Sequence, residues 1–190
     1  TGMIGLAYLD EGARNFLTTD SPVRRLEDMK NRKIRMQISD LMEDTVVALG
    51  AEAIPISYAE LYTALESGSV EGAENPPISY YYNRFYEVAP YYVKDCHTYA
   101  PGVILASQVT WENLTEDQRY VLLKAAELTQ EYNKKEIEQA DEQAYKNLEW
   151  MGVEITEVED PEAWREAMKP VYEKYGSRFR SVIQRVQAMK

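Results

Sequence analysis

The sequence has little cysteine, histidine or glycine, and each shortage disfavours a class of site. Its 190 residues contain one cysteine and one histidine, Cys96 and His97, so no internal disulfide forms within them and a metal site is poorly supported. The nine glycines form no phosphate-binding loop, because ESGSVEG and GAEN have neither the spacing nor the lysine of one. We therefore expect no cofactor and no metal.

Positive charge is also scarce. The chain has 21 Lys and Arg against 32 Asp and Glu, which gives a net charge of -11 and a pI near 4.7. Binding to phosphates requires a basic surface, so we expect no nucleic-acid partner. No run approaches the roughly 20 apolar residues that cross a bilayer, so we expect no direct membrane insertion of this chain. It opens on TGMIGLAYLDEG, without initiator methionine or leader, which suggests a fragment or a processed chain.

A catalytic pair of Cys96 and His97 is disfavoured too. The segment 91–99 is typical of a strand, and neighbouring side chains on a strand point to opposite faces. His97 is then better explained as a hydrogen-bonded structural histidine, or as a residue at the edge of a cleft.

What the sequence does contain is an alternation of strand-like and helical segments. Apolar residues make up 45% of the chain, enough for a real core. The alternation predicts an α/β fold with a largely parallel sheet. Ser57 and Glu60 suggest a capping box at one helix start, and Pro170 should split a late helix and leave a basic one at 174–190. The expected strands are Met3–Leu9, 33–37, 91–99, Gly102–Ser107 and 152–156.

One helix is expected to be unusually long. Neither glycine nor proline interrupts Glu116–Trp150, and Thr115 with Gln118 suggests a capping box at its start. About 35 residues at 1.5 Å each give a helix of roughly 50 Å, longer than a small domain is wide. We predict that it bridges two lobes. A coiled coil is the alternative, although the apolar stripe lacks a clean heptad of large residues.

Two arginines occupy positions that suggest anion binding. Arg14 follows a strand and a glycine, and Arg35 lies within an apolar strand, where a surface salt bridge is the ordinary alternative. A guanidinium can bind a carboxylate through two parallel hydrogen bonds, and ligands of α/β sheets gather at the carboxyl ends of strands. In VEGAENPPISYYYNRFYE, Pro76 favours an extended backbone at Asn75, and the tyrosines that follow supply aromatic surface.

Several of these segments together resemble the solute-binding proteins of tripartite ATP-independent periplasmic (TRAP) transporters, the family related to the dicarboxylate-binding subunit. They cover almost the whole chain in order. The similar segments are GAR, SPVRRLEDMKNRKIRMQ, ALGAEAIPISYAELYTALESGSVEGAEN, NRFYEVAPYYVKDCHTYAP, LTEDQRYVLLKAAE and GVEITE.

The resemblance implies a two-lobed periplasmic-binding-protein-like α/β fold with a long helix across both lobes, the first lobe being largely absent from this chain. Residues 1–100 would form the second lobe with most ligand contacts, 101–125 would contribute to the first lobe, 116–150 would be the long helix, and 151–190 would return to the second lobe.

The resemblance also implies site residues. Arg35 would be the principal carboxylate partner and Arg14 a second or water-linked contact. Tyr58 would pack against the ligand and Asn75 would hydrogen-bond it. Further candidates are Glu74, His97 and Tyr99.

These implications predict a receptor, not an enzyme. It would bind a small organic acid (a dicarboxylate, keto acid or sugar acid) and deliver it to the membrane subunits of a TRAP transporter. Its location would be periplasmic or extracellular, with a lipid anchor if the source is Gram-positive. One alternative is an enzyme in which Arg35 and Arg14 orient a carboxylate substrate for Glu74 as base. Another is an interaction module that uses the tyrosine-rich surface.

Overall fold

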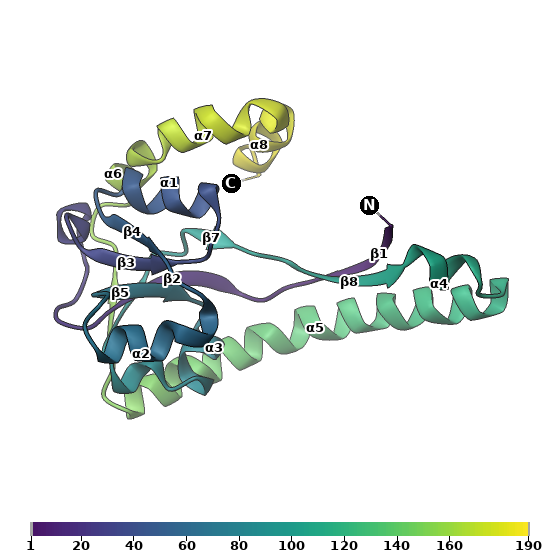
Figure 1. Ribbon diagram of the computed structural model, residues 1–190, viewed down its shortest axis with the longest axis horizontal. Coiled ribbons are helices and arrows are strands. Elements are labelled where there is room, and N and C mark those ends of the chain that lie inside the picture. Colours follow the sequence, from purple (N-terminus) through teal and green to yellow (C-terminus); the bar gives the residue numbers. More distant parts are fainter. Residues whose placement is uncertain (1, 190) are drawn as a thin grey trace.

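The chain folds into a lobe built on a seven-stranded sheet and an arm that projects from it, as the computed structural model of residues 2–189 shows (Figure 1). The strands are β1 (Met3–Leu9), β2 (Ala13–Thr18), β3 (Lys33–Met36), β4 (Glu52–Pro55), β5 (Gly72–Asn75), β6 (Tyr91–Lys94), β7 (Thr98–Tyr99), β8 (Gly102–Ser107) and β9 (Glu154–Glu157). The α-helices are α1 (Asp40–Ala48), α2 (Leu61–Glu66), α3 (Pro77–Tyr82), α4 (Gln108–Glu112), α5 (Glu116–Trp150), α6 (Pro161–Ala167), α7 (Lys169–Gly176) and α8 (Arg180–Gln187). Short 3-10 helices cover Leu26–Met29, Tyr58–Glu60, Phe85–Glu87 and Ser177–Phe179.

The sheet of the lobe has the order β4-β3-β5-β2-β6-β9, with β7 also paired to β2. β3 is parallel to β4 and β5, and β6 is parallel to β9, but β2 is antiparallel to both β5 and β6. The sheet is therefore mixed, which corrects the expectation of a largely parallel one. β2 enters from the arm without a crossover helix, so it runs opposite to its neighbours. As a result, the start of β2 lies beside the ends of β5 and β6.

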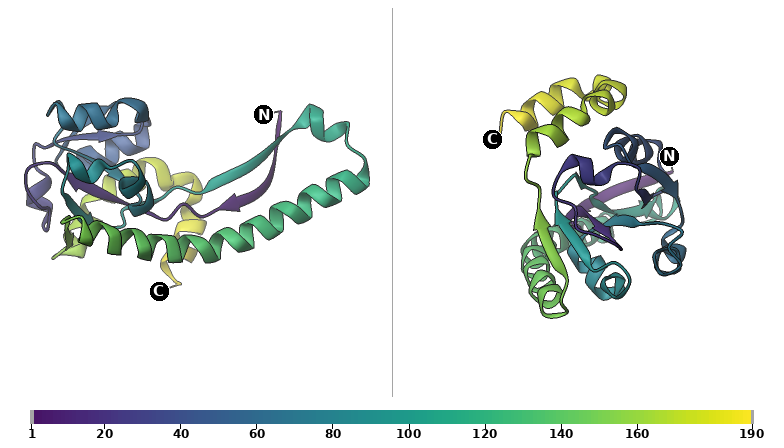
Figure 2. Two further views of the ribbon diagram at one scale, coloured as in Figure 1. Left: turned by 90° about the horizontal axis from the view of Figure 1, so that it is seen from below. Right: turned by 90° about the vertical axis from the view of Figure 1, so that its left-hand side faces the viewer.

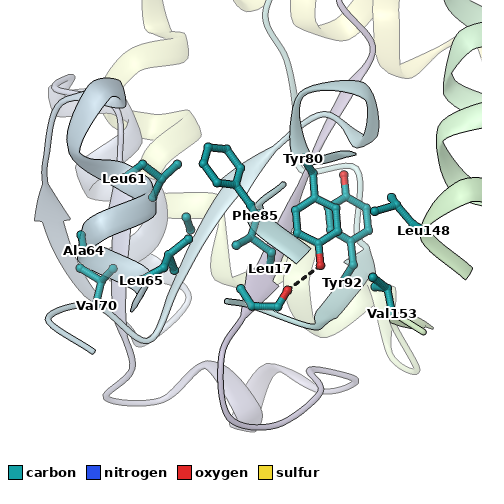
Figure 3. Packing of buried hydrophobic residues seen from close by; sticks show 12 residues of the cluster. Leu17, Leu61, Ala64, Leu65, Val70, Tyr80, Phe85, Tyr92, Leu148 and Val153 are labelled. Carbon is teal, nitrogen blue, oxygen red and sulfur yellow. Dashed lines mark hydrogen bonds between the residues drawn. The ribbon is translucent and has the colours of Figure 1, made fainter. Parts of the chain in front are cut away.

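Two hydrophobic cores lie on opposite faces of this sheet. Adjacent residues of a strand point to opposite faces, and in β2 Phe16 and Leu17 each enter a different core with no exposed surface. Leu17 packs with α2, α3 and the end of α5, while Phe16 packs with α1 and α6. In the first core, Tyr80 and Tyr92 stack with ring centroids 4.7 Å apart (Figure 3).

The arm consists of a two-stranded ribbon, α4 and the first half of α5 (Figure 2). β1 and β8 pair antiparallel, and β1 packs on α5. The predicted long helix is confirmed over Glu116–Trp150, and its capping box is present, with hydrogen bonds in both directions between Thr115 and Gln118. The helix packs on β1 at one end and on α3 at the other, so among the described residues it lies against a strand and a short helix rather than in a coiled coil.

The arm exposes much apolar surface. A ribbon on one helix has only two layers, so its outer face has no covering element among residues 2–189. None of the helices in this range combines the length and the apolar character needed to cross a bilayer. The exposed large apolar side chains of the arm include Tyr8, Val103, Leu105, Tyr120, Val121, Leu128 and Tyr132.

The prediction of one strand over 91–99 is wrong. The chain leaves the sheet after Lys94 and returns at β7, and Cys96 between them has φ +49°. Side-chain hydrogen bonds replace the ladder here: Phe16 N–H donates to Asp95 Oδ1 and Cys96 N–H donates to Asn15 Oδ1, both at 2.9 Å. The argument that placed Cys96 and His97 on opposite faces of a strand therefore does not apply.

Two helix predictions also differ from the structure. Ser57 makes no side-chain cap on a backbone N–H, and its hydroxyl instead donates to the Glu60 carboxylate, so the chain passes through a 3-10 turn before α2. The basic helix expected over 174–190 is not continuous, because α7 ends at Gly176 and α8 begins at Arg180. Pro170 does mark a break as predicted, since α6 ends at Ala167. The division of the chain into lobes stays a proposal. Within the part of the chain that the structure describes, β1 pairs with β8 of the arm and with no strand of the lobe.

Candidate functional site

Four of the candidate residues meet at one edge of the lobe's sheet. Arg35 lies near the end of β3, and Glu74 and Asn75 end β5, which is parallel to it. Arg14 lies at the start of the antiparallel β2, whose next residue is in register with Asn75. The topology therefore brings side chains from distant parts of the sequence to one strand edge, the place where α/β sheets bind ligands.

Arg35 is a buried guanidinium without a counterion. Its residue is 2% exposed, it forms no ion pair among the described residues, and its Nη1 is buried without a hydrogen-bond partner. Its Nε donates to the Ile56 carbonyl at 2.9 Å, which fixes the plane of the group. Burial lowers the pKa of Arg35, with Glu74 acting in the opposite direction. A buried charge with a free donor is costly unless an anion meets it.

Arg14 is in the opposite situation. Its guanidinium pairs with the fully buried carboxylate of Glu74, through Nε to Oε2 and through Nη2 to Oε1 at 3.0 Å. Nη2 also donates to the Glu74 backbone carbonyl at 3.0 Å and reaches Asn75 Oδ1 at 3.4 Å. Burial acts to raise the pKa of Glu74, but the neighbouring His97 and Arg14 outweigh it and lower this pKa. The charge of Arg14 is therefore neutralised inside the protein.

His97 completes the ion network. Its Nδ1 lies 2.6 Å from Asp95 Oδ2, its Nε2 lies 3.8 Å from Glu74 Oε2, and its ring stacks on Phe16 at 4.2 Å between centroids. Burial acts to lower the pKa of His97, but Asp95 and Glu74 together raise it to about 9. At neutral pH the imidazolium therefore carries a proton on Nε2, an atom without a hydrogen-bond partner among the described residues.

Asn75 is held by the tyrosines behind it. Its backbone carbonyl accepts a hydrogen bond from the Tyr92 hydroxyl at 2.8 Å, and Tyr92 stacks on Tyr80, whose own hydroxyl donates to the Ala89 carbonyl. The Asn75 side chain is buried, and its Nδ2 has no partner among the described residues. The tyrosines thus fix an amide donor at the strand edge.

The site therefore offers three unpaired N–H donors and no unpaired acceptor among the candidate residues. The donors are Arg35 Nη1, Asn75 Nδ2 and protonated His97 Nε2. Buried polar atoms are normally hydrogen-bonded, so three orphan donors at neighbouring strand ends call for an oxygen-rich anionic ligand.

The remaining candidates lie further out. Tyr58 is 46% exposed, with its ring centroid 5.9 Å from Arg35 Cζ, so it can cover a ligand bound there. Tyr99 is 65% exposed and lines a cavity beside the arm, away from Arg35. Two cavities of 520 and 500 Å³ border the lobe, and neither is lined by Arg35 or Asn75, although His97 lines the second.

Sequence reasoning missed two residues that organise the site. Asp95 holds the His97 ring, and the Tyr92 hydroxyl supports the Asn75 backbone. The acid beside the sole histidine in DCH was a usable signal for the first. No local pattern indicates the second, because Tyr92 and Asn75 are 17 residues apart.

Comparison with known proteins identifies relatives for nearly the whole chain. The family model described as bacterial extracellular solute-binding protein, family 7, matches residues 1–178. The uncharacterized protein YiiZ of Salmonella typhimurium is 37% identical over all of this chain and 58% of its own length. The C4-dicarboxylate-binding protein DctB of Bacillus subtilis is 29% identical over 90% of this chain and 50% of its own length.

Several solved protein structures are also similar to this chain. A TRAP periplasmic solute-binding protein of Bradyrhizobium, in complex with galacturonate, has a TM-score of 0.92 and 36% identity over 98% of this chain and 63% of its own. One from Pseudomonas putida F1 with bound D-glucuronate has a TM-score of 0.93 and 32% identity over 98% of this chain and 60% of its own. The chain thus spans about 60% of the length of these relatives. It belongs to the family of bacterial extracellular solute-binding proteins, family 7.

Proposed function

We propose that the chain is the larger part of a two-lobed extracytoplasmic receptor, which binds a small organic acid through Arg35 and delivers it to a TRAP-type secondary transporter. The observation that carries this proposal is the buried, unpaired guanidinium of Arg35, beside the free donors of Asn75 and His97. The arm would be the part of the other lobe that this chain contributes. Its exposed apolar side chains support that role, because they are suited to packing under further elements.

The charge balance of the site supports a ligand with one carboxylate at this lobe. Arg14 is paired with Glu74 and His97 with Asp95, whereas Arg35 has no counterion among residues 2–189. A sugar acid meets this description, since its single carboxylate can engage Arg35 while hydroxyl oxygens accept from Asn75 and His97. The galacturonate and glucuronate bound to the two structural relatives support this class, although the DctB relative is described as binding C4-dicarboxylates.

The energetics are compatible with a working receptor. Hydrogen bonds to charged groups contribute about 1.5–3 kcal/mol each. Two or three of them, with burial of a sugar ring against Tyr58, are compatible with a dissociation constant of about 1 μM, which corresponds to about 8 kcal/mol.

Calorimetry on protein that contains both lobes tests this function. D-galacturonate and D-glucuronate should bind the wild type, Arg35→Ala should abolish binding, and Arg35→Lys should restore little because it lacks the planar fork. Arg24→Ala is the matched control, since Arg24 is about half exposed and pairs with Glu154 away from the site. Undiminished affinity in Arg35→Ala with an intact fold would contradict the proposal.

The enzyme alternative has less support. Its proposed base, Glu74, is buried in an ion pair and has a lowered pKa, which makes it a poor proton acceptor. The relatives whose descriptions state a role are binding proteins. Incubation with candidate acids followed by product analysis distinguishes the two functions: unchanged ligand supports the receptor, and turnover supports the enzyme.

The interaction-module alternative depends on tyrosines at the surface. In the YYY run, Tyr80 is fully buried and Tyr82 is 76% exposed, so most of the aromatic surface near Asn75 faces the core. We also propose membrane subunits of a TRAP transporter as partners, and a periplasmic or extracellular location. The relatives lend no support to a lipid anchor, and we do not propose one.

A further inference from the structure

Apart from α5, which runs from the arm into the lobe, the arm joins the lobe through two short segments that lie outside the strand ladders. Residues 10–12 separate β1 from β2, and residues 100–101 separate β7 from β8. The cavity of 520 Å³ lies beside both segments. Unpaired backbone with free space next to it bends more easily than a ladder, so these segments form the hinge between arm and lobe.

On the arm side of the hinge, α5 holds the backbone of β1. The Tyr8 N–H donates to Gln130 Oε1 at 2.9 Å, and the Asp10 N–H donates to Asn133 Oδ1 at 2.7 Å. Asn133 Nδ2 returns a hydrogen bond to the Asp10 carbonyl at 3.1 Å. These bonds fix the arm strand to the helix, so bending begins beyond Asp10.

On the lobe side, Asp141 of α5 lies directly against Gly12. Gly12 has φ +79°, and a Cβ atom there would lie 2.7 Å from Asp141 Oδ2. Asp141 Oδ1 is buried without a hydrogen-bond partner among the described residues. Gly12 is two residues before Arg14, so a movement at this contact is passed along the backbone to the anion site.

Apart from Lys94, the groups that face Asp141 are acidic or neutral. Burial, and then the neighbouring Asp10 carboxylate, raise the pKa of Asp141 to about 6. The nearby cation, Lys94, lies over the ring of Tyr145 at 4.2 Å from its centroid, and no ion pair joins it to Asp141. The other titratable groups that face Asp141 are Tyr92 and Cys96 on β6 and the loop after it, Tyr99 on β7, and Tyr145 on α5 itself.

We propose that Asp141 is a positioning residue for lobe closure, and that its protonated carboxyl group holds the hinge in the arrangement seen here. This inference rests on the proposed receptor function. The arrangement of lobe and arm is that of a ligand-bound relative, because the superposition on the glucuronate-bound protein covers 98% of the chain with a TM-score of 0.93. A charged Asp141 is better hydrated when Gly12 moves away, which favours the bent-open hinge.

The sign of the pH effect follows from this assignment. If the carboxyl has a higher pKa in the closed form than in the open form, acid favours closure and therefore ligand binding. With a pKa of about 6 when closed and an ordinary value when open, affinity should rise by at most about tenfold between pH 7.5 and pH 5. The ligand carboxylate and His97 keep their charges over this range.

The test is calorimetry with D-glucuronate at pH 5, 6 and 7.5 on protein that contains both lobes. The wild type should bind several-fold more tightly at pH 5, and Asp141→Asn should bind at all three pH values as the wild type does in acid. The control Glu138→Gln, an exposed acid on the same helix, should keep the wild-type profile. An unchanged pH profile in a folded Asp141→Asn variant would overturn the inference and leave the receptor function standing.

A second variant tests the same inference if Asp141→Asn does not fold. Asp10→Asn removes the neighbouring charge while its side-chain oxygen can still accept from Gly12 N–H, the bond seen at 2.9 Å. The acid-dependent gain in affinity should then move to lower pH. If the gain stays at the same pH, Asp141 is not the group responsible. If D-glucuronate does not bind the wild type at any of the three pH values, the proposed receptor function for this ligand is contradicted, and the pH inference falls with it.

Discussion

Arg14 and Glu74 form a buried ion pair at the ends of two antiparallel strands, and the two side chains are 8% and 0% exposed. Removal of one partner of such a pair is strongly destabilising, because the other partner is left as an uncompensated buried charge. It distinguishes the two arginines at this strand edge: Arg14 has a buried counterion, and Arg35 has none among the described residues.

Replacement of Glu74 by Gln should lower the free energy of unfolding by about 3–5 kcal/mol, because Arg14 and His97 both lose their shared carboxylate. Urea unfolding monitored by circular dichroism measures this. The exposed pair of Arg84 and Glu87, 3.5 Å apart, provides a control, since Glu87→Gln should change stability by less than about 1 kcal/mol. Equal effects of the two variants would show that the Glu74 pair is not buried as described.

Replacement of Tyr92 by Phe should cost about 1–3 kcal/mol, because the Asn75 carbonyl loses a buried donor while the ring stack on Tyr80 is kept. The variant should also weaken acid binding if Asn75 contributes to the site. Tyr82→Phe, at a position that is 76% exposed, is the control and should leave stability and binding unchanged. If Tyr92→Phe changes neither stability nor acid binding, the Tyr92 hydroxyl does not support Asn75.

The stability contributed by His97 should depend on pH in a defined window. Its folded-state pKa of about 9 is above the ordinary value of 6.5, so the contribution is complete below pH 6.5 and is lost as pH rises through 9. Chemical unfolding of the wild type and of His97→Gln at pH 6, 7.5 and 9.5 measures this difference. The gap between the two proteins should narrow toward pH 9.5, and a gap that widens with pH would show that the imidazole is buried in its neutral form.

Gly72 begins β5, and Gly72→Ala should destabilise the lobe. A Cβ atom there would lie 2.5 Å from the Leu17 carbonyl oxygen and 2.8 Å from Ile34 Cδ1, so backbone must move. Overpacking of this kind costs about 1–3 kcal/mol. Gly5→Ala in the arm is the control, because no atom lies within 4 Å of the added Cβ. Thermal unfolding of both variants compares them directly.

Much of the fold could be predicted because its signals are local. The long helix is marked by the Thr115 and Gln118 capping box and by the absence of breakers, and its bounds are confirmed. The extended backbone at Asn75 follows from what a proline permits in the residue before it. The antiparallel insertion of β2 could not be predicted from patterns, since hydrophobic periodicity carries no information on strand direction.

The site could be predicted less completely. The positions of Arg14 and Arg35 suggest anion binding, and the resemblance assigns them and Asn75 to ligand contacts. The structure brings the three residues to one edge, where their binding roles stay proposals. The break at Asp95–His97 was missed because the stabilising hydrogen bonds come from Asn15 and the Phe16 backbone, about 80 residues earlier. Long-range side-chain bonds of this kind leave no mark on a local pattern.

The ribbon of β1 and β8 has a practical consequence for anyone who purifies these residues alone. Among residues 2–189, each of its strands leaves one edge without a partner, and its outer face carries Tyr8, Val103 and Leu105. Open edges of this type are templates on which other chains add strands. At high protein concentration the isolated polypeptide should therefore self-associate through the ribbon and precipitate, even though the lobe beside it is well packed.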